Sequence, residues 1–99
     1  MRIILVLAVT FGMAVAAGAQ EDQCAAVGEL AAAIMDGRQN GIVMSAAMAA
    51  YPTDKQGREL YVEMVKEAYG EPQWASDDRK SQAAIDFRNE AEFACYTAD

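Results

Sequence analysis

Apolar residues recur at three- and four-residue steps along most of the chain, which is the spacing of one face of an α-helix. This pattern predicts a first helix from about Asp22 to Arg38 or Gln39. Leu30 widens its buried face. Either Gly37 or Gly41 fits the left-handed cap, and Gly41 is favoured because Arg38 then lies at the negative end of the helix dipole. The core of the face consists of Cys24, Val27, Ala31, Ile34 and Met35.

The middle of the chain predicts two shorter helices. Ser45 is the expected N-cap of the first, which spans about 46–51 and stops at a proline. The second starts after a capping box formed by Thr53 and Gln56, and it ends at Gly70. Its buried stripe at helical spacing consists of Leu60, Tyr61, Met64, Val65, Ala68 and Tyr69.

A last helix is predicted to run to about Tyr96. Ser76 is its N-cap, and Asp77 and Asp78 lie at the positive end of its dipole. The turn before it holds Trp74, which we expect to form a lid over the end of the bundle, with an exposed anchor for a partner as the alternative. The inward face of the helix, mostly alanine, consists of Ala83, Ala84, Phe87, Ala91, Ala94 and Cys95.

The start of the chain has the pattern of a secretory signal peptide over 1–19. A basic residue precedes an apolar run at 3–15, and small residues then predict cleavage between Ala19 and Gln20. The alternative is an uncleaved membrane anchor, which is disfavoured because this run is shorter than the roughly 20 residues that a membrane-spanning helix needs. We expect no membrane association after cleavage. The remaining residues, 20–99, are predicted to form a single helical domain.

Cys24 and Cys95 are the only cysteines, and an exported chain meets an oxidising compartment. A disulfide between them is therefore predicted, with a free thiol pair or an intermolecular bridge as the alternatives. The bridge would make the first and last helices antiparallel neighbours, with Gly28 opposite Ala91 in close contact. The predicted fold is an all-α bundle of three long helices and one short helix, with one disulfide.

Composition and charge then limit the chemistry. The chain has no His, which excludes Ser-His and Cys-His catalysis, and two Cys are too few for a zinc site made of cysteines alone. Acidic residues number 15 against 8 basic ones, for a net charge of −7, so binding to nucleic-acid phosphates is not expected. We predict neither a cofactor nor a metal. Core packing is the preferred role, ahead of copper(I) binding or an adaptable groove, for Met35, Met44, Met48 and Met64.

The carboxylates are the only abundant reactive groups. Solvated helix faces explain them better than catalysis does, because Lys55 and Glu59, like Glu63 and Lys66, have the spacing of helical ion pairs. We therefore predict that the protein is not an enzyme. The candidates for the carboxyl pair of a glycosidase would be Glu29, Glu63, Asp86 and Glu90.

Arg88 borders the inward face of the last helix. The register set by the two cysteines places it near Ala31, with Glu29 and Asp36 within reach for an ion pair that fixes the register. The alternative is an ordinary surface arginine, whose stem covers the core while its head stays in water.

Two segments, Gly-Arg-Gln-Asn-Gly at 37–41 and Asp-Phe-Arg-Asn at 86–89 before the late Cys, resemble a set of small exported bacterial proteins. The resemblance implies a helical fold and export in a Gram-negative bacterium, to the periplasm or out of the cell. It implies no activity. The positions that it marks as structural or interacting are Arg38, Gln39, Phe87, Arg88 and Asn89.

These patterns together favour a small non-enzymatic protein that binds another protein of the cell envelope, as a helper, an inhibitor or an accessory subunit. The excess of acidic groups favours basic partners. The alternative is an acid-stress chaperone of the periplasm, which protonation of the carboxylates would loosen. A carboxylate enzyme acting on glycans is the third hypothesis. No particular oligomeric state is predicted.

Overall fold

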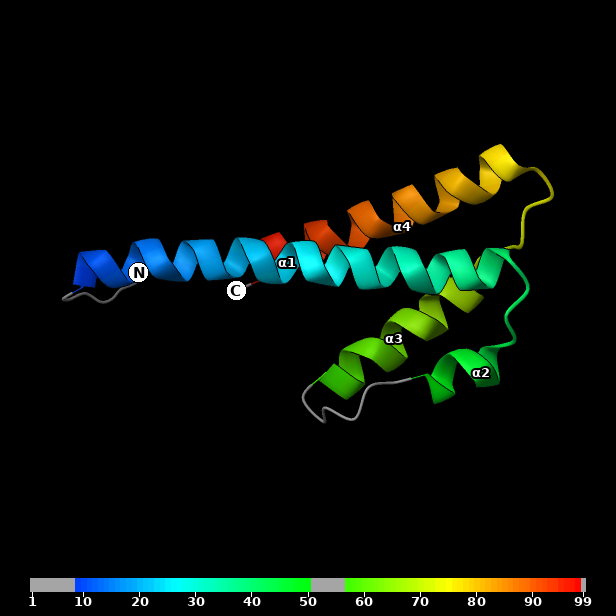
Figure 1. Cartoon of the computed structure of the whole chain (residues 1–99), viewed down its shortest axis with the longest axis horizontal. Coiled ribbons are helices and arrows are strands. Elements are labelled where there is room, and N and C mark those ends of the chain that lie inside the picture. Colours follow the sequence, from blue (N-terminus) through cyan, green and yellow to red (C-terminus); the bar gives the residue numbers. More distant parts are fainter. Residues whose placement is uncertain (1–8, 51–56, 99) are drawn as a thin grey trace.

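A computed structural model of the chain describes the backbone of residues 9–50 and 57–98 and the side chains of residues 22–50 and 57–98 (Figure 1). The described residues form four helices and no strand, which confirms the predicted all-α fold with one short helix. The predicted Thr53–Gln56 capping box lies outside the described residues. The helices are α1 (Val9–Gln39), α2 (Met44–Ala49), α3 (Arg58–Tyr69) and α4 (Asp77–Thr97).

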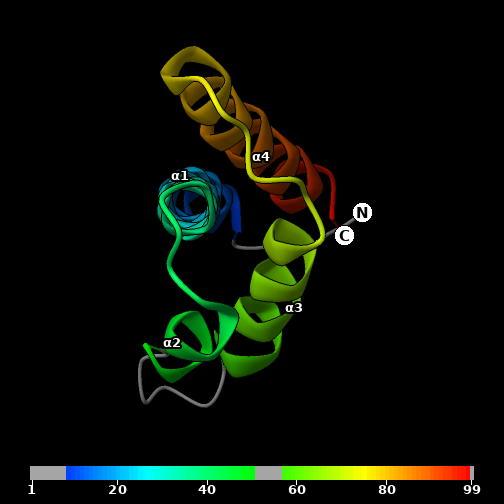
Figure 2. The same ribbon diagram turned by 90° about the vertical axis from the view of Figure 1, so that its right-hand side faces the viewer.

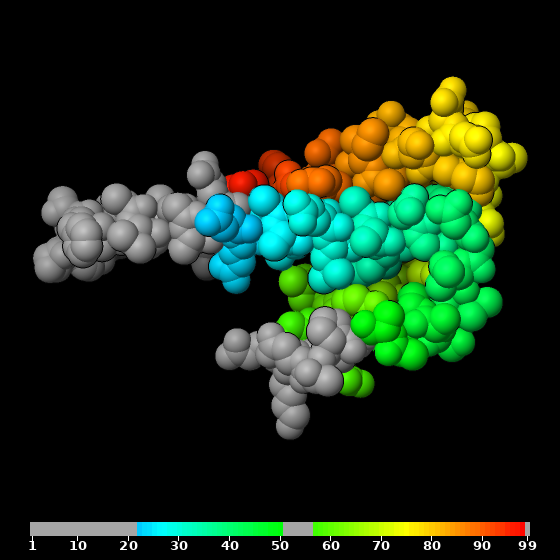
Figure 3. Space-filling view, viewed as in Figure 1, coloured from blue at the N-terminus to red at the C-terminus, as the bar shows by residue number. Residues whose placement is uncertain are grey.

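α1 is the central element on which the other long helices pack. α4 runs antiparallel to it and makes the most extensive contact, whereas α3 touches α1 over a shorter stretch and scarcely contacts α4. Figure 2, in which α1 is seen end-on, shows α3 and α4 diverging on either side of it. Figure 3 shows α4 covering one flank of α1, with α2 and α3 on the other. α3 and α4 therefore pack on α1 and scarcely on each other.

The ends of the elements follow local capping chemistry. Gly41 has a φ of 87°, which confirms the left-handed position after α1, and the Ser76 hydroxyl accepts the Arg79 N–H at 3.2 Å as the N-cap of α4. Ser45 as the N-cap of α2 was wrong. The extended residue Val43 takes that position, and its carbonyl accepts the first N–H groups of the helix. α1 begins at Val9 rather than near Asp22, since alanines with high helix propensity lie on both sides of the predicted cleavage site.

The core lies where α3 crosses α1. Four positions of the predicted α3 stripe are buried there, but Leu60 is 47% exposed, because α3 diverges from α1 towards its own N-terminal end. Met44 is also exposed, contrary to its predicted core role, while Met48 packs against the core. The buried cluster consists of Ala31, Ile34, Met35, Tyr61, Met64, Val65, Ala68 and Phe87.

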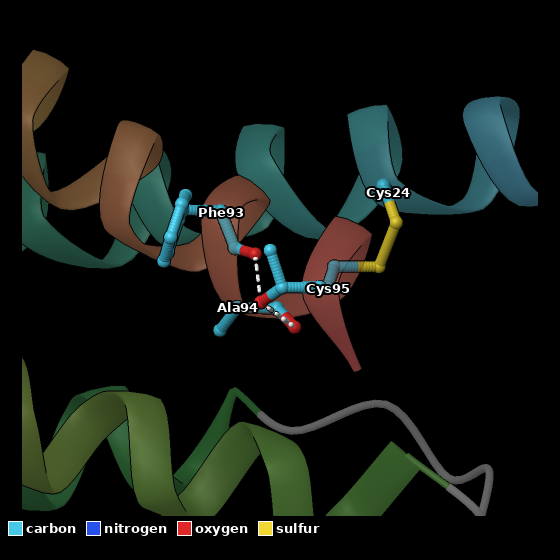
Figure 4. The surroundings of a disulfide bond; sticks show 5 residues. Cys24, Phe93, Ala94 and Cys95 are labelled. Carbon is cyan, nitrogen blue, oxygen red and sulfur yellow. Dashed lines mark hydrogen bonds between the residues drawn. A yellow bond between two sulfur atoms is a disulfide. The ribbon is translucent and has the colours of Figure 1, made fainter. Parts of the chain in front are cut away.

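The disulfide between Cys24 and Cys95 is formed, with a Cα–Cα distance of 5.5 Å (Figure 4). It joins α1 to the last turn of α4, where the Thr97 hydroxyl donates to the Phe93 carbonyl at 2.7 Å. This bond holds α1 and α4 as the antiparallel pair that the sequence predicts.

Gly28 lies at a close contact between these two helices. A Cβ atom at this position would overlap with Oε2 of Glu92 and lie 2.5 Å from its Cγ. The predicted close contact is thus confirmed, but the facing residue is Glu92 rather than Ala91. The Glu92 side chain passes over the glycine to reach Arg88, whose Nε lies 2.8 Å from its carboxylate.

We expect Gly28→Leu to lower the free energy of unfolding by about 2–3 kcal/mol, because the new side chain forces α1 and α4 apart. Urea unfolding followed by circular dichroism measures the change. The control is the pair Gly28→Ala and Gly28→Ala/Glu92→Ala. The second variant should be the more stable of the two, since removal of the Glu92 side chain leaves room for the Cβ. A Gly28→Leu protein as stable as the wild type would contradict the close contact.

Tyr61 connects α3 to α2, because its hydroxyl donates to the Ala47 carbonyl. Burial raises the pKa of Tyr61 above 10.0, and Tyr69 adds to this shift. The unfolded chain therefore loses the phenol proton at a lower pH than the folded protein. The stabilisation is complete below pH 10.0 and is lost as the pH rises through the pKa of the folded state.

We expect a steeper loss of stability above about pH 10 in the wild type than in Tyr61→Phe, in which this proton is absent. Thermal unfolding at a series of pH values measures the slope. Tyr96→Phe, which removes one phenol hydroxyl at an exposed position, is the matched control. Identical slopes for the wild type and Tyr61→Phe would contradict the assignment.

Candidate functional site

The C-terminal end of α1 holds the α3–α4 turn in place. The Arg38 guanidinium donates from Nε at 3.1 Å and from Nη2 at 2.9 Å to the Glu71 carbonyl, and it lies over the Tyr69 ring at 5.3 Å. These contacts fix the end of α3 against α1. Arg38 is therefore committed to a structural contact in this part of the protein.

Gln39, the last residue of α1, is also in contact with the α3–α4 turn, and none of its surface is exposed. We call the contacts of Arg38 and Gln39 with this turn the anchor. Gln39 Nε2 donates to the Pro72 carbonyl at 2.8 Å, and Gln39 Oε1 accepts the Trp74 N–H at 2.8 Å. The backbone carbonyl of Gln39 accepts hydrogen bonds from the side-chain amide of Gln73 and from the Lys80 ammonium. The Gln39 side chain thus pairs with two backbone groups of the turn, and its backbone carbonyl attaches the start of α4 through Lys80.

Trp74 is half-buried beside a cavity of about 310 Å³ between the turn, α1 and α4. The Arg79 guanidinium lies over its ring at 4.7 Å from the centroid, which is within the range of a cation–π contact. Trp74 therefore lines the cavity and is neither fully buried nor fully exposed, and its role as a lid over the end of the bundle stays a prediction. The cavity is lined by Met35, Glu71, Trp74, Arg79, Gln82, Ala83, Asp86, Phe87 and Glu90.

A second hollow of about 390 Å³ lies between α3 and α4, with α1 behind it. Most of its lining is apolar. Leu60 and Ala94, which the helical pattern predicts to be buried, line this hollow and are exposed in it. The lining residues are Gln23, Val27, Leu60, Glu63, Met64, Glu67, Phe87, Glu90, Ala91, Ala94, Cys95 and Ala98.

Phe87 and Glu90 line both spaces, so the cavity and the hollow are neighbours along α4. We call the hollow between α3 and α4, together with the adjoining cavity, the α3–α4 groove. Phe87 is 6% exposed and forms the division between the two parts. The groove therefore extends from the α3–α4 turn to the disulfide, since Cys95 is among its lining residues.

Arg88 and Asn89 lie apart from the groove lining. The ionic partner of Arg88 is Glu92, one turn later on the same helix, so the predicted pair with Glu29 or Asp36 was wrong. The reason is that the Glu92 side chain lies over Gly28, which leaves room for it, and its carboxylate there accepts a hydrogen bond from Arg88 Nε. Asn89 is exposed on α4.

The candidate carboxylates are only partly brought together. Glu63 and Glu90 face each other across the hollow, Asp86 lines the cavity with Glu90, and Glu29 lines neither. Asp86 accepts a hydrogen bond from Gln82 at 2.8 Å.

Among the residues with described side chains, no group of three Asp, Glu, Cys or His side chains is arranged to hold a metal ion. Over the helices that the structure describes, none is both long and apolar enough to cross a bilayer.

Comparison with models of known families, with curated proteins and with solved structures found no match to this chain. The geometry of the groove is therefore the basis for assigning a function. The apolar pattern along the chain did not predict this groove, nor the contacts of Lys80, Glu71 and Gln73 at the end of α1. The only local signal for the groove is the run of small residues on α4, because alanines leave space beside a neighbouring helix.

Proposed function

We propose that this chain is a small exported helical protein without enzymatic activity that binds another protein through the α3–α4 groove. A disulfide in a chain of this size suits an oxidising compartment outside the cytoplasm, and it agrees with the signal-peptide pattern at 1–19. The observation that carries the proposal is the apolar hollow between α3 and α4, in which Leu60 is 47% exposed.

The hollow has the properties of a protein-binding surface. Its floor includes Met64 and Phe87, which belong to the core and are held rigidly, while Leu60 extends from the rim. Concave apolar surfaces next to polar rims receive the anchor side chains of partner proteins. A preformed floor also reduces the side-chain ordering that binding requires.

Capture experiments with paired variants test this proposal. Protein produced from the full chain and purified from the envelope is used as bait in an envelope extract of the organism that encodes it. Leu60→Glu places a charge at the rim of the hollow, whereas Phe93→Glu places the same charge at an exposed apolar residue of α4 outside the groove lining. We expect the wild type and Phe93→Glu to retain the same partner, and Leu60→Glu to lose it.

Helix content by circular dichroism shows that both variants are folded. Equal retention of the partner by both variants would contradict the groove as the binding surface. Capture of many proteins only at acid pH would overturn the proposal and favour an acid-stress chaperone.

A further inference from the structure

We infer that the α3–α4 groove binds a cationic amphipathic helical segment of the partner protein, with apolar side chains in the hollow and basic side chains against its carboxylates. This inference rests on the proposed function and adds the chemistry of the partner. It is drawn from the distribution of charge around the hollow and from the shape of the apolar lining.

Carboxylates border the hollow on both sides. Glu63 and Glu67 belong to α3, Glu90 belongs to α4, and no Lys or Arg is among the described lining residues. Lys66 lies 3.7 Å from Glu63, but both side chains are more than half exposed, so this pair neutralises little of the charge. The hollow therefore presents an apolar floor between two negatively charged edges.

The adjoining cavity continues the same pattern. Glu71, Asp86 and Glu90 supply three carboxylates, against the single guanidinium of Arg79, which lies over the Trp74 ring. A segment that follows the groove from the hollow towards the turn thus meets negative charge along its whole length. Complementary positive charge on the partner increases the rate of association and selects the partner.

The apolar lining fits the side chains of a helix. Ala91 and Ala94 on α4 leave open space opposite Leu60 and Met64 on α3, and the resulting hollow measures about 390 Å³. Helices that bind in grooves insert anchors spaced three and four residues apart, with polar side chains at either edge. Two turns of such a helix, about 11 Å, lie alongside two turns of α3.

The carboxylates also disfavour other occupants. A neutral apolar segment would cover Glu67 and Glu90 without offering them a partner, and burying an unpaired carboxylate costs free energy. An acidic segment would add repulsion between like charges. A basic amphipathic segment can cover the apolar floor with its apolar side chains and pair its basic side chains with the carboxylates at the edges.

Binding of designed peptides tests the inference. The probe is a labelled 14-residue helical peptide of Leu and Lys, with the leucines at three- and four-residue spacing, and the control peptide carries Glu in place of Lys. Fluorescence anisotropy measures the dissociation constant of each peptide for the disulfide-bonded protein. We expect saturable binding of the Lys peptide, weakened by salt, and binding of the Glu peptide at least about tenfold weaker.

Two double variants with the same change in net charge separate the groove from the overall charge. Glu67→Gln/Glu90→Gln removes carboxylates from opposite edges of the groove, and Glu29→Gln/Asp36→Asn removes two exposed carboxylates of α1. We expect the first variant to bind the Lys peptide about tenfold more weakly than the second. Equal affinities of the two variants, or the absence of saturable binding by the wild type, would overturn the inference.

The capture experiment keeps the two proposals distinguishable. A partner that Phe93→Glu retains and Leu60→Glu loses supports the binding function, even where the Lys peptide does not bind. In that case the inference about a cationic segment fails and the proposed function stands. If neither the partner nor the peptide depends on the groove, both proposals fail.

Discussion

Replacing both Cys24 and Cys95 by Ala is expected to lower the free energy of unfolding by about 4 kcal/mol, because the disulfide closes a long loop in the unfolded chain. The two cysteines are 71 positions apart, so the bond spans nearly all of the described chain from residue 22 onward. A chain-entropy estimate for such a loop is about 4.4 kcal/mol. Small domains have total stabilities of only about 5–15 kcal/mol, so the variant should be close to unfolding at 37 °C.

Urea unfolding followed by circular dichroism measures this loss. The wild type treated with a reducing agent is the control, and it should unfold at nearly the same urea concentration as the double alanine variant. An alanine variant with the midpoint of the oxidised wild type would show that the bond contributes little to stability. Alanine is preferred to serine here, because Cys24 is fully buried and a hydroxyl there would lack a partner.

Gln39→Leu is expected to lower the free energy of unfolding by about 2–3 kcal/mol, because it leaves two backbone groups of the α3–α4 turn without their partners. The Trp74 N–H loses its acceptor and the Pro72 carbonyl loses its donor, while leucine has nearly the same volume as glutamine. Gln39→Glu should also be destabilising, since one carboxylate oxygen would face the Pro72 carbonyl. The turn should then separate from the end of α1.

The same substitution at an exposed glutamine is the control. Gln82→Leu on α4 should change stability by no more than about 0.5 kcal/mol. Trp74 is the only tryptophan, so its fluorescence reports directly on the turn, and a shift to longer wavelength is expected for Gln39→Leu alone. Unchanged stability and fluorescence in this variant would mean that the turn is held by other contacts.

Much of the helical framework follows from local sequence signals. Gly41 ends α1 and Ser76 starts α4 because their backbone and side-chain chemistry acts over a few residues. The pairing of Cys24 with Cys95 is the single intramolecular choice for two cysteines, and it already makes α1 and α4 antiparallel neighbours. Close contact at Gly28 follows from that register to within one residue.

The binding surface depends on distances that sequence periodicity does not contain. Helical spacing places Leu60 on the same face as Met64, but whether that face is covered depends on the angle between α3 and α1. The divergence of α3 leaves Leu60 and Ala94 uncovered, and the groove results from this divergence. A pattern of apolar positions predicts which side of a helix faces inward, but not how far along the helix a neighbour extends.

Gln39 combines a position that local sequence predicts with contacts that only helix packing sets. Its place at the end of the first helix, two residues before a glycine cap, follows from local sequence, because helix ends depend on neighbouring residues. The contacts of its amide with Pro72 and Trp74, which are 33 and 35 positions away, depend on how the helices pack. Local chemistry therefore determines the helices and the disulfide pairing. The anchor and the groove depend instead on the angle at which α3 packs on α1, because contacts between residues far apart in the sequence form only when the helices pack.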